Sequence, residues 1–140
     1  MKPSDKYHLI NEMLEVPDLM RRFNPAITAS WADKITTEKR LFITGEGSSR
    51  IFPAKNMMDH ALKQQTGWQI FTHGARQAAD YALQNFILLA ASNSGRTREV
   101  IELYKQRENY KFAVTAAEDS PLEAVSNQTI TLSCGAEQAV

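Results

Sequence analysis

From residue 40 onwards, short apolar runs alternate with segments of helical periodicity, and this alternation constrains the fold more than any other feature of the sequence. Residues 86–91 are apolar throughout, which is typical of a central strand buried on both faces of a parallel sheet. Parallel strands joined by helices imply helices on both faces of that sheet. We therefore expect a three-layer α/β domain of about five strands, near residues 41–43, 70–71, 86–91, 112–114 and 129–132.

Helical patterns fill the segments between the predicted strands. Apolar residues at spacings of three and four follow Pro53, which is tolerated in the first turn of a helix. Val100, Ile101 and Tyr104 mark a second helical face, downstream of the most apolar strand. Two shorter helices are expected over residues 75–83 and 122–125.

The N-terminal part of the chain does not follow this alternation. A short helical face at residues 10–14 is interrupted by Pro17, and another follows with four-residue spacing at residues 27–35. We therefore predict a helical extension over residues 1–38 ahead of a domain over residues 39–140. The last six residues read as the opening of a helix, and a helix needs more than one turn to be stable. We expect the domain to be truncated at its C-terminal end.

The charges of the chain balance, which excludes several classes of partner. Sixteen basic residues offset sixteen acidic ones, so there is no basic excess to hold a nucleic-acid backbone or an anionic membrane. The single cysteine excludes a disulfide framework and a cysteine-built metal site. The N-terminus has no apolar signal region, and no apolar run is long enough to span a bilayer. We expect a cytoplasmic protein that binds neither nucleic acid nor membrane.

The loop after the most apolar strand carries the strongest functional signal. Residues 92–97 read SNSGRT and open a helix, whose free N–H groups and dipole favour an anion. The hydroxyl and amide side chains can donate to that anion, and the glycine lets the backbone approach it. Capping the helix would need only one of these hydroxyls, so the loop favours phosphate binding. The candidate phosphate ligands are Ser92, Asn93, Ser94, Gly95 and Thr97.

A second loop rich in glycine and serine follows the first predicted strand. Residues 45–49 read GEGSS, and such turns often need glycine and serine only to turn the chain and cap a helix. This loop alone therefore leaves a structural and a functional interpretation open. It gains weight because ligands of parallel sheets bind at the carboxyl ends of the strands, where both loops are expected.

Together the two loops resemble the sugar isomerase (SIS) family, whose pattern is a glycine–serine loop after the first strand and a Ser-x-Ser-Gly-x-Thr loop after a later one. The resemblance covers residues 40–140. Residues 135–140 read GAEQAV and resemble the Gly-Thr-Glu-x-x-Val segment of the double-domain branch, which includes the isomerase half of glucosamine-6-phosphate synthase. Ala136 stands where that segment has threonine, and residues 11–17 resemble the helical leader of the branch. The chain is similar to the first SIS domain of such a protein.

The resemblance implies a site as well as a fold. Residues 92–97 would hold the phosphate, while the sugar would contact the first loop and the C-terminal tail. The carboxylate base, the ring-opening histidine and the lysine would lie in segments beyond this chain. Glu137 is the one carboxylate here that we would test as a base. Proteins of this resemblance need no metal and no organic cofactor. The implied sugar contacts are Gly47, Ser48, Ser49, Glu137 and Val140.

Other polar residues at predicted strand ends favour structural roles. Glu118 and Asp119 precede a proline and are typical of a turn. Glu46 would lie near the phosphate, where its charge is unfavourable unless the side chain points away. The three histidines lack metal-ligand spacing, and His73 is the best candidate among them because it ends a strand. Cys134 is more typical of a small buried apolar residue.

We predict that the chain binds a sugar phosphate, such as a hexose or aminosugar 6-phosphate, as part of an aldose–ketose isomerase or an aminosugar-phosphate isomerase or deaminase. The alternative is a non-catalytic SIS sensor that binds a phosphosugar and regulates a partner. The leader has no clear helix-turn-helix and is not basic, which disfavours a DNA-binding sensor. The resemblance also implies pairing of two SIS domains, as a homodimer or larger assembly or within one chain, through the leader helices and a helix flanking the sheet.

Overall fold

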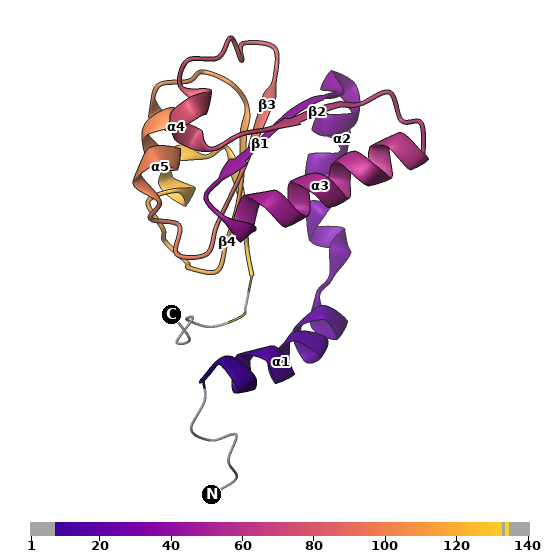
Figure 1. Ribbon diagram of the computed structural model, residues 1–140, viewed down its shortest axis with the longest axis vertical. Helices are drawn as coiled ribbons and strands as arrows, with labels where there is room; N and C mark the ends of the chain where they lie inside the picture. Colours follow the sequence, from indigo (N-terminus) through magenta and orange to yellow (C-terminus); the bar gives the residue numbers. More distant parts are fainter. Residues whose placement is uncertain (1–7, 133, 135–140) are drawn as a thin grey trace, which may run out of the picture.

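The computed structural model describes residues 8–132 and residue 134. Five parallel strands form one sheet in the order β2-β1-β3-β4-β5, with helices on both of its faces (Figure 1). This arrangement confirms the predicted three-layer α/β fold. The strands are β1 (Arg40–Gly45), β2 (Gln69–Thr72), β3 (Ile87–Ser92), β4 (Lys111–Thr115) and β5 (Gln128–Thr131).

Two groups of helices cover the two faces of the sheet. Helices α2 and α3 contribute to the hydrophobic core on one face, and α4 and α5 contribute to the core on the other. Helix α1 belongs to neither group. The helical segments are α1 (His8–Arg22), η2 (Pro25–Thr28), α2 (Ala29–Glu38), α3 (Ser48–Lys63), α4 (Ala75–Ala78), α5 (Arg98–Lys105) and η3 (Glu123–Val125).

Strand β1 lies where the order of the strands reverses. It pairs with β2 on one side and with β3 on the other, so the chain first builds outwards in one direction and then crosses to the opposite side. The register places Gly45 of β1 beside Ala91 of β3. The loops that follow β1 and β3 therefore leave the sheet side by side at its carboxyl edge. This switch point is where open parallel sheets bind their ligands.

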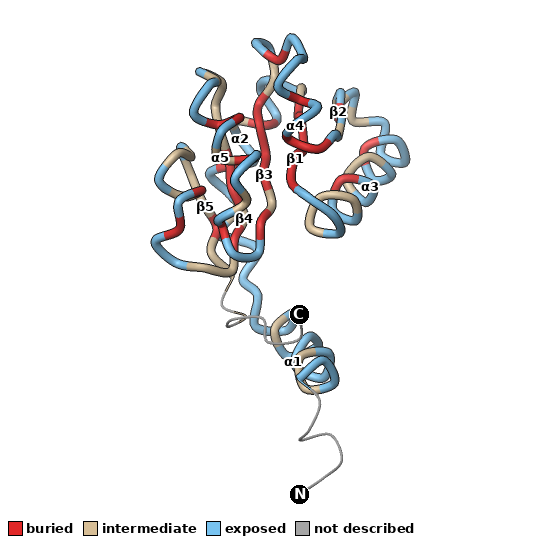
Figure 2. The backbone as a smooth tube through the Cα atoms, turned by 60° about the vertical axis from the view of Figure 1, so that its left-hand side comes forward, coloured by how far each residue is buried: buried red, intermediate tan, exposed pale blue. Residues whose placement is uncertain are grey.

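The side chains of the strands fill the two cores in alternation. Leu41 and Ile43 face α2 and α3, whereas Phe42, between them, faces α4 and α5. Figure 2 shows β3 buried along most of its length at the centre of the sheet. On the α5 face, the buried hydroxyl of Tyr104 donates to the carbonyl oxygen of Phe112 at 2.8 Å. Burial raises the pKa of Tyr104 well above its usual value, so this side chain stays a neutral donor.

The predictions for two helices near prolines were wrong. Helix α3 begins at Ser48, upstream of Pro53, because the N–H groups of Arg50 and Ile51 close its first turn on the carbonyl oxygen of Gly47 (3.3 and 3.2 Å). Helix α1 continues through Pro17 instead of ending there. A proline removes one hydrogen bond from a helix, and because α1 is exposed, water can replace it.

Helix α4 is shorter than the predicted helix over residues 75–83. It ends at Ala78, because side chains from the segment between α5 and β4 take the carbonyl oxygens that a longer helix would use. The guanidinium group of Arg107 donates to the carbonyl oxygens of Ala78 and Ala79, and the amide of Asn109 donates to that of Leu83. These bonds hold residues 79–86 as a loop.

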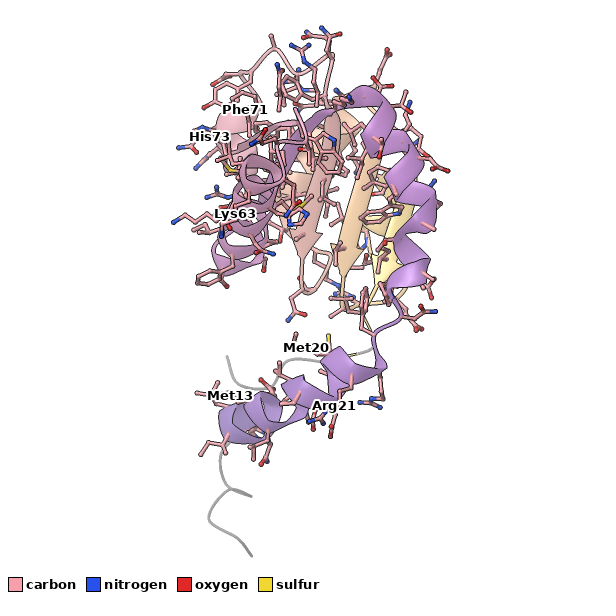
Figure 3. All side chains as sticks on the ribbon, turned by 90° about the vertical axis from the view of Figure 1, so that its right-hand side faces the viewer. Met13, Met20, Arg21, Lys63, Phe71 and His73 are labelled. Carbon is pink, nitrogen blue, oxygen red and sulfur yellow. The ribbon has the colours of Figure 1, made fainter. Side chains whose placement is uncertain are left out.

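Helix α1 stands apart from the sheet, on the side of its carboxyl edge (Figures 1 and 2). None of its residues is buried. Figure 3 shows Met13 and Met20 on this helix, clear of the sheet and its covering helices, and 64% and 74% of these side chains are exposed. By contrast, α2 places Trp31 and Ile35 in the core. Among the described residues, no helix is both long and apolar enough to cross a membrane.

Candidate functional site

The two loops singled out in the sequence lie next to each other at the switch point. Gly45 pairs with Ala91, and Ser92 follows as the last residue of β3. The strands approach closely here, because a Cβ atom on Gly45 would lie 2.6 Å from the carbonyl oxygen of Ala91. The absence of a side chain at Gly45 therefore allows the first loop to leave the sheet directly against the second.

The loop after β3 forms a compact turn ahead of α5. The hydroxyl groups of Ser92 and Thr97 lie 2.9 Å apart and hydrogen-bond across the turn. The hydroxyl of Ser94 is exposed and accepts from the N–H of Arg96 at 3.3 Å. Thr97 is the N-cap residue of α5, but its side chain makes no capping hydrogen bond. The first N–H groups of α5 therefore point into the loop without a side-chain cap.

Gly95 anchors this loop on the segment that follows β4. Its φ angle is +62°, a conformation that favours glycine. A Cβ atom here would lie 2.4 Å from both the Cβ and the Oγ atoms of Ser120, and 3.0 Å from Oγ1 of Thr115. The carbonyl oxygen of Gly95 accepts from the N–H of Leu122 at 3.0 Å. The loop therefore rests on a floor that leaves no room for a side chain.

Thr115 and Ser120 form this floor, and the sequence analysis missed both. Thr115 donates its hydroxyl to the carbonyl oxygen of Asn93 at 3.1 Å, and the N–H of Ala116 donates to the same oxygen at 2.9 Å. Ser120 is 4% exposed and accepts from the N–H of Glu123 at 3.3 Å, at the start of η3. Two signals could have identified them, since Thr115 ends a predicted strand and Ser120 precedes a proline.

The loop after β1 brings a second helix start to the same edge. Gly47, with a φ angle of +57°, is the N-cap residue of α3, and this position also has no side-chain capping bond. Ser48 and Ser49 are the first residues of the helix, with Ser48 exposed and Ser49 half-buried. The predicted sugar contacts of this loop thus lie beside the predicted phosphate ligands of the other.

Glu46 points away from the phosphate loop. Its Oε1 atom accepts from the N–H of Ala75 at 3.3 Å, at the start of α4. Both carboxylate oxygens lie within 3.7 Å of the position that a Cβ atom on Gly74 would occupy. The side chain therefore reaches towards β2, on the far side of β1 from the loop over residues 92–97. Its charge does not oppose a phosphate at that loop by direct contact.

Cations near the phosphate loop are directed elsewhere. The guanidinium group of Arg98 pairs with Glu102 at 2.7 Å on the outer surface of α5, and this hydrogen bond raises the pKa of Arg98. An anion at this edge would therefore be held by backbone N–H groups and hydroxyl groups rather than by an arginine. Two uncapped helix starts with several hydroxyl groups beside them form an arrangement suited to a phosphate ester.

The other candidates do not join this arrangement. Glu118 and Asp119 lie in a turn, with Asp119 at a φ angle of +50°. His73 lies beside Phe71 near the end of β2 (Figure 3), and its Nδ1 atom is 3.5 Å from the hydroxyl of Tyr81. Within residues 8–132 and 134, no three histidine, cysteine or acidic side chains gather as a metal site would require. The predicted contacts Glu137 and Val140 fall outside the described residues.

Comparisons with known proteins add evidence on the fold. The sequence matches no known protein family and no curated protein. The structure is similar to the C-terminal domain of glucosamine-fructose-6-phosphate aminotransferase from Francisella tularensis, with a TM-score of 0.73 and 16% identity over 98% of this chain and 42% of the other.

Two further similar structures contain phosphosugars. A protein of E. coli CFT073 in complex with a phosphosugar has a TM-score of 0.67 and 21% identity, over 94% of this chain and 75% of the other. The Vibrio vulnificus NanR protein complexed with ManNAc-6P has a TM-score of 0.64 and 19% identity, over 89% of this chain and 49% of the other. The chain thus has the fold of phosphosugar isomerases. This is the SIS fold that the two loops predicted.

Proposed function

We propose that this chain binds a sugar phosphate at the carboxyl edge of its sheet. The observation that carries the proposal is the meeting of two helix starts, those of α3 and α5, neither of which has a side-chain cap. The two similar structures that hold phosphosugars support a ligand of the same class. The phosphate would bind at Ser92, Asn93, Ser94, Gly95 and Thr97, and the sugar would lie over Gly47, Ser48 and Ser49.

The activity of the whole protein belongs to the same proposal. The ligand would be a hexose or aminosugar 6-phosphate, and the protein an aldose–ketose isomerase or an aminosugar-phosphate isomerase or deaminase. The chain spans less than half of the two longer similar structures. A base and a ring-opening acid would then come from outside the described residues, with Glu137 as a further candidate. The alternative is a sensor that binds the same ligand without converting it.

A binding titration with turnover measurements tests the proposal. We expect hexose and aminosugar 6-phosphates to raise the thermal midpoint of the chain, whereas the free sugars do not. A ligand present at about 100 times its Kd adds roughly 2.7 kcal/mol of stability. Conversion of the bound sugar in the same samples supports the isomerase, and binding without conversion supports the sensor. A folded chain that responds to none of the phosphates contradicts both.

Ser94→Ala locates the phosphate within this test. We expect the variant to keep its thermal midpoint without ligand, because Ser94 is exposed. Its affinity for the best phosphosugar should fall about tenfold or more, since one hydrogen bond to a charged group is worth about 1.5–3 kcal/mol. Ser126→Ala is the matched control, because this serine bonds the carbonyl oxygen of Leu122 outside the two loops. Equal affinities of wild type and Ser94→Ala would remove Ser94 from the site.

We also propose that two copies of the chain pair through α1. This helix exposes several large apolar side chains and forms, with η2 and the end of β5, an apolar hollow of about 520 Å³. A 15-residue helix is marginal in water without packing partners. Because α1 lies on the side of the carboxyl edge, a copy packed on it would stand next to the two loops. Residues of the partner could then complete the site.

Charge reversal on the apolar face of α1 tests this pairing. Sedimentation should show a dimer or larger assembly for the wild-type chain, and Leu14→Glu should weaken that association about tenfold or more because it places an unpaired charge in the contact. Gln106→Glu, at the exposed end of α5, adds the same charge and should leave the assembly intact. A monomeric wild-type chain, or an unchanged assembly of Leu14→Glu, would contradict the pairing.

A further inference from the structure

Glu46 is the one acidic residue within the two site loops, and the proposed function gives it no role. It follows β1 directly, between Gly45 and the proposed sugar contacts of Gly47 and Ser48. The hydrogen bond from the N–H of Ala75 holds its carboxylate on the β2 side of β1. The phosphate loop lies on the other side, after β3. The two groups thus stand at opposite ends of the edge formed by β3, β1 and β2.

The spacing of the strands gives the distance that a ligand would cover. Neighbouring strands lie roughly 4.8 Å apart, so a group on the β2 side of β1 is roughly one to two strand spacings, about 5–10 Å, from a phosphate above β3. A sugar attached to that phosphate and lying over the first loop would cover this distance. Its end remote from the phosphate would then face the carboxylate of Glu46.

The charge of Glu46 is not neutralised by an ion pair among the described residues. Its side chain is exposed, so a ligand can reach it. Two cations lie on the neighbouring elements. Arg50 of α3 donates to the hydroxyl of Thr72 at 3.2 Å, and Arg76 of α4 lines the hollow between α4 and α5, away from the two loops. A net negative charge therefore remains where the far end of the sugar would lie.

We propose that Glu46 sets the charge selectivity of the sugar end of the site, an inference that rests on the proposed function. The carboxylate accepts hydrogen bonds from neutral hydroxyl groups or from a protonated amino group, and it repels a second phosphate. The site therefore takes sugar monophosphates and rejects sugar bisphosphates. Like charges close together disfavour binding, and at an exposed site the effect amounts to a several-fold change in affinity rather than complete exclusion.

Glu46→Gln separates this charge from the structural contact of the side chain. Glutamine keeps an oxygen that can accept from the N–H of Ala75, so the loop should retain its conformation while losing one negative charge. Calorimetry would compare glucose 6-phosphate with glucose 1,6-bisphosphate, and fructose 6-phosphate with fructose 1,6-bisphosphate. We expect the wild-type chain to favour each monophosphate about tenfold. In Glu46→Gln this preference should fall to about twofold, with the gain on the bisphosphate side.

The controls distinguish this inference from the proposed function. Glu108→Gln removes the same charge at the opposite edge of the sheet, where the residue is exposed, and should keep the wild-type preference. Circular dichroism verifies the fold of each variant, and Glu46→Ala provides a second neutral variant if the glutamine disturbs the loop. An unchanged preference in folded Glu46 variants overturns this inference alone. Failure of the wild-type chain to bind any of the four probes overturns the proposed function, and this inference with it.

Discussion

Replacing Gly95 with alanine should weaken phosphosugar binding by at least about a hundredfold. A Cβ atom at this position would lie 2.4 Å from the Cβ atom of Ser120, a distance that real side chains do not tolerate. Either the loop or its floor must move, and the N–H and hydroxyl groups that converge on the phosphate move with it. Losing two hydrogen bonds to a charged group costs about 3–6 kcal/mol, which exceeds the value needed for a hundredfold loss.

The same substitution should also lower the free energy of unfolding. An L-residue with a φ angle near +62° costs about 1–3 kcal/mol, and the contact with Ser120 adds to that cost. Calorimetric titration measures the affinity and urea unfolding measures the stability. The titration is made at a temperature at which the variant remains folded, so that the loss of affinity is not a loss of folded protein.

Gly67→Ala is the matched control for Gly95→Ala. Gly67 has a similar φ angle of +71°, but a Cβ atom there would meet no atom within 4 Å. It should therefore lose stability through its backbone strain and keep the wild-type affinity. Combining Gly95→Ala with Ser120→Gly removes the closest contact and should restore part of the binding. Wild-type affinity in the single Gly95→Ala variant would show that the phosphate does not bind at this loop.

The sequence was sufficient to predict the layers and the strands, because their signals are local. The apolar run at residues 86–91 became β3, and the other four runs each became a strand of the same parallel sheet. Both loops were also predicted, since a strand followed by serines and glycine is a pattern within a few residues. The prolines misled the helix boundaries, because Gly47 starts α3 upstream of Pro53 and only the fold sets that start.

The support of the phosphate loop could not be predicted in the same way. Thr115 and Ser120 act through contacts with Asn93 and Gly95, more than 20 positions earlier in the chain, and no local pattern records such a contact. The pairing of the Ser92 and Thr97 hydroxyls was missed for a different reason. Both residues were predicted as phosphate ligands, but the sequence does not show that the two side chains meet across the turn. Their role towards a phosphate stays a prediction.

Replacing Trp31 with alanine should cost about 3–5 kcal/mol of the free energy of unfolding. Trp31 belongs to α2, in the segment predicted as an N-terminal extension, yet it is 7% exposed and lies in the core under the sheet. Its ring stacks on that of Phe112 of β4, with centroids 4.4 Å apart and an angle of 28° between the planes. Truncation would remove this contact and leave a cavity between α2 and the sheet.

Urea unfolding followed by circular dichroism measures this loss, and two further variants assign its cause. Trp31→Phe keeps an aromatic ring beside Phe112 and should lose less stability than Trp31→Ala. Phe52→Ala truncates an aromatic side chain that is 71% exposed on α3, and should change the stability by less than about 0.5 kcal/mol. Since whole domains are stable by only about 5–15 kcal/mol, the expected loss would make α2 an obligatory part of the folding unit. A Trp31→Ala chain as stable as wild type would instead make α2 a detachable extension, like α1.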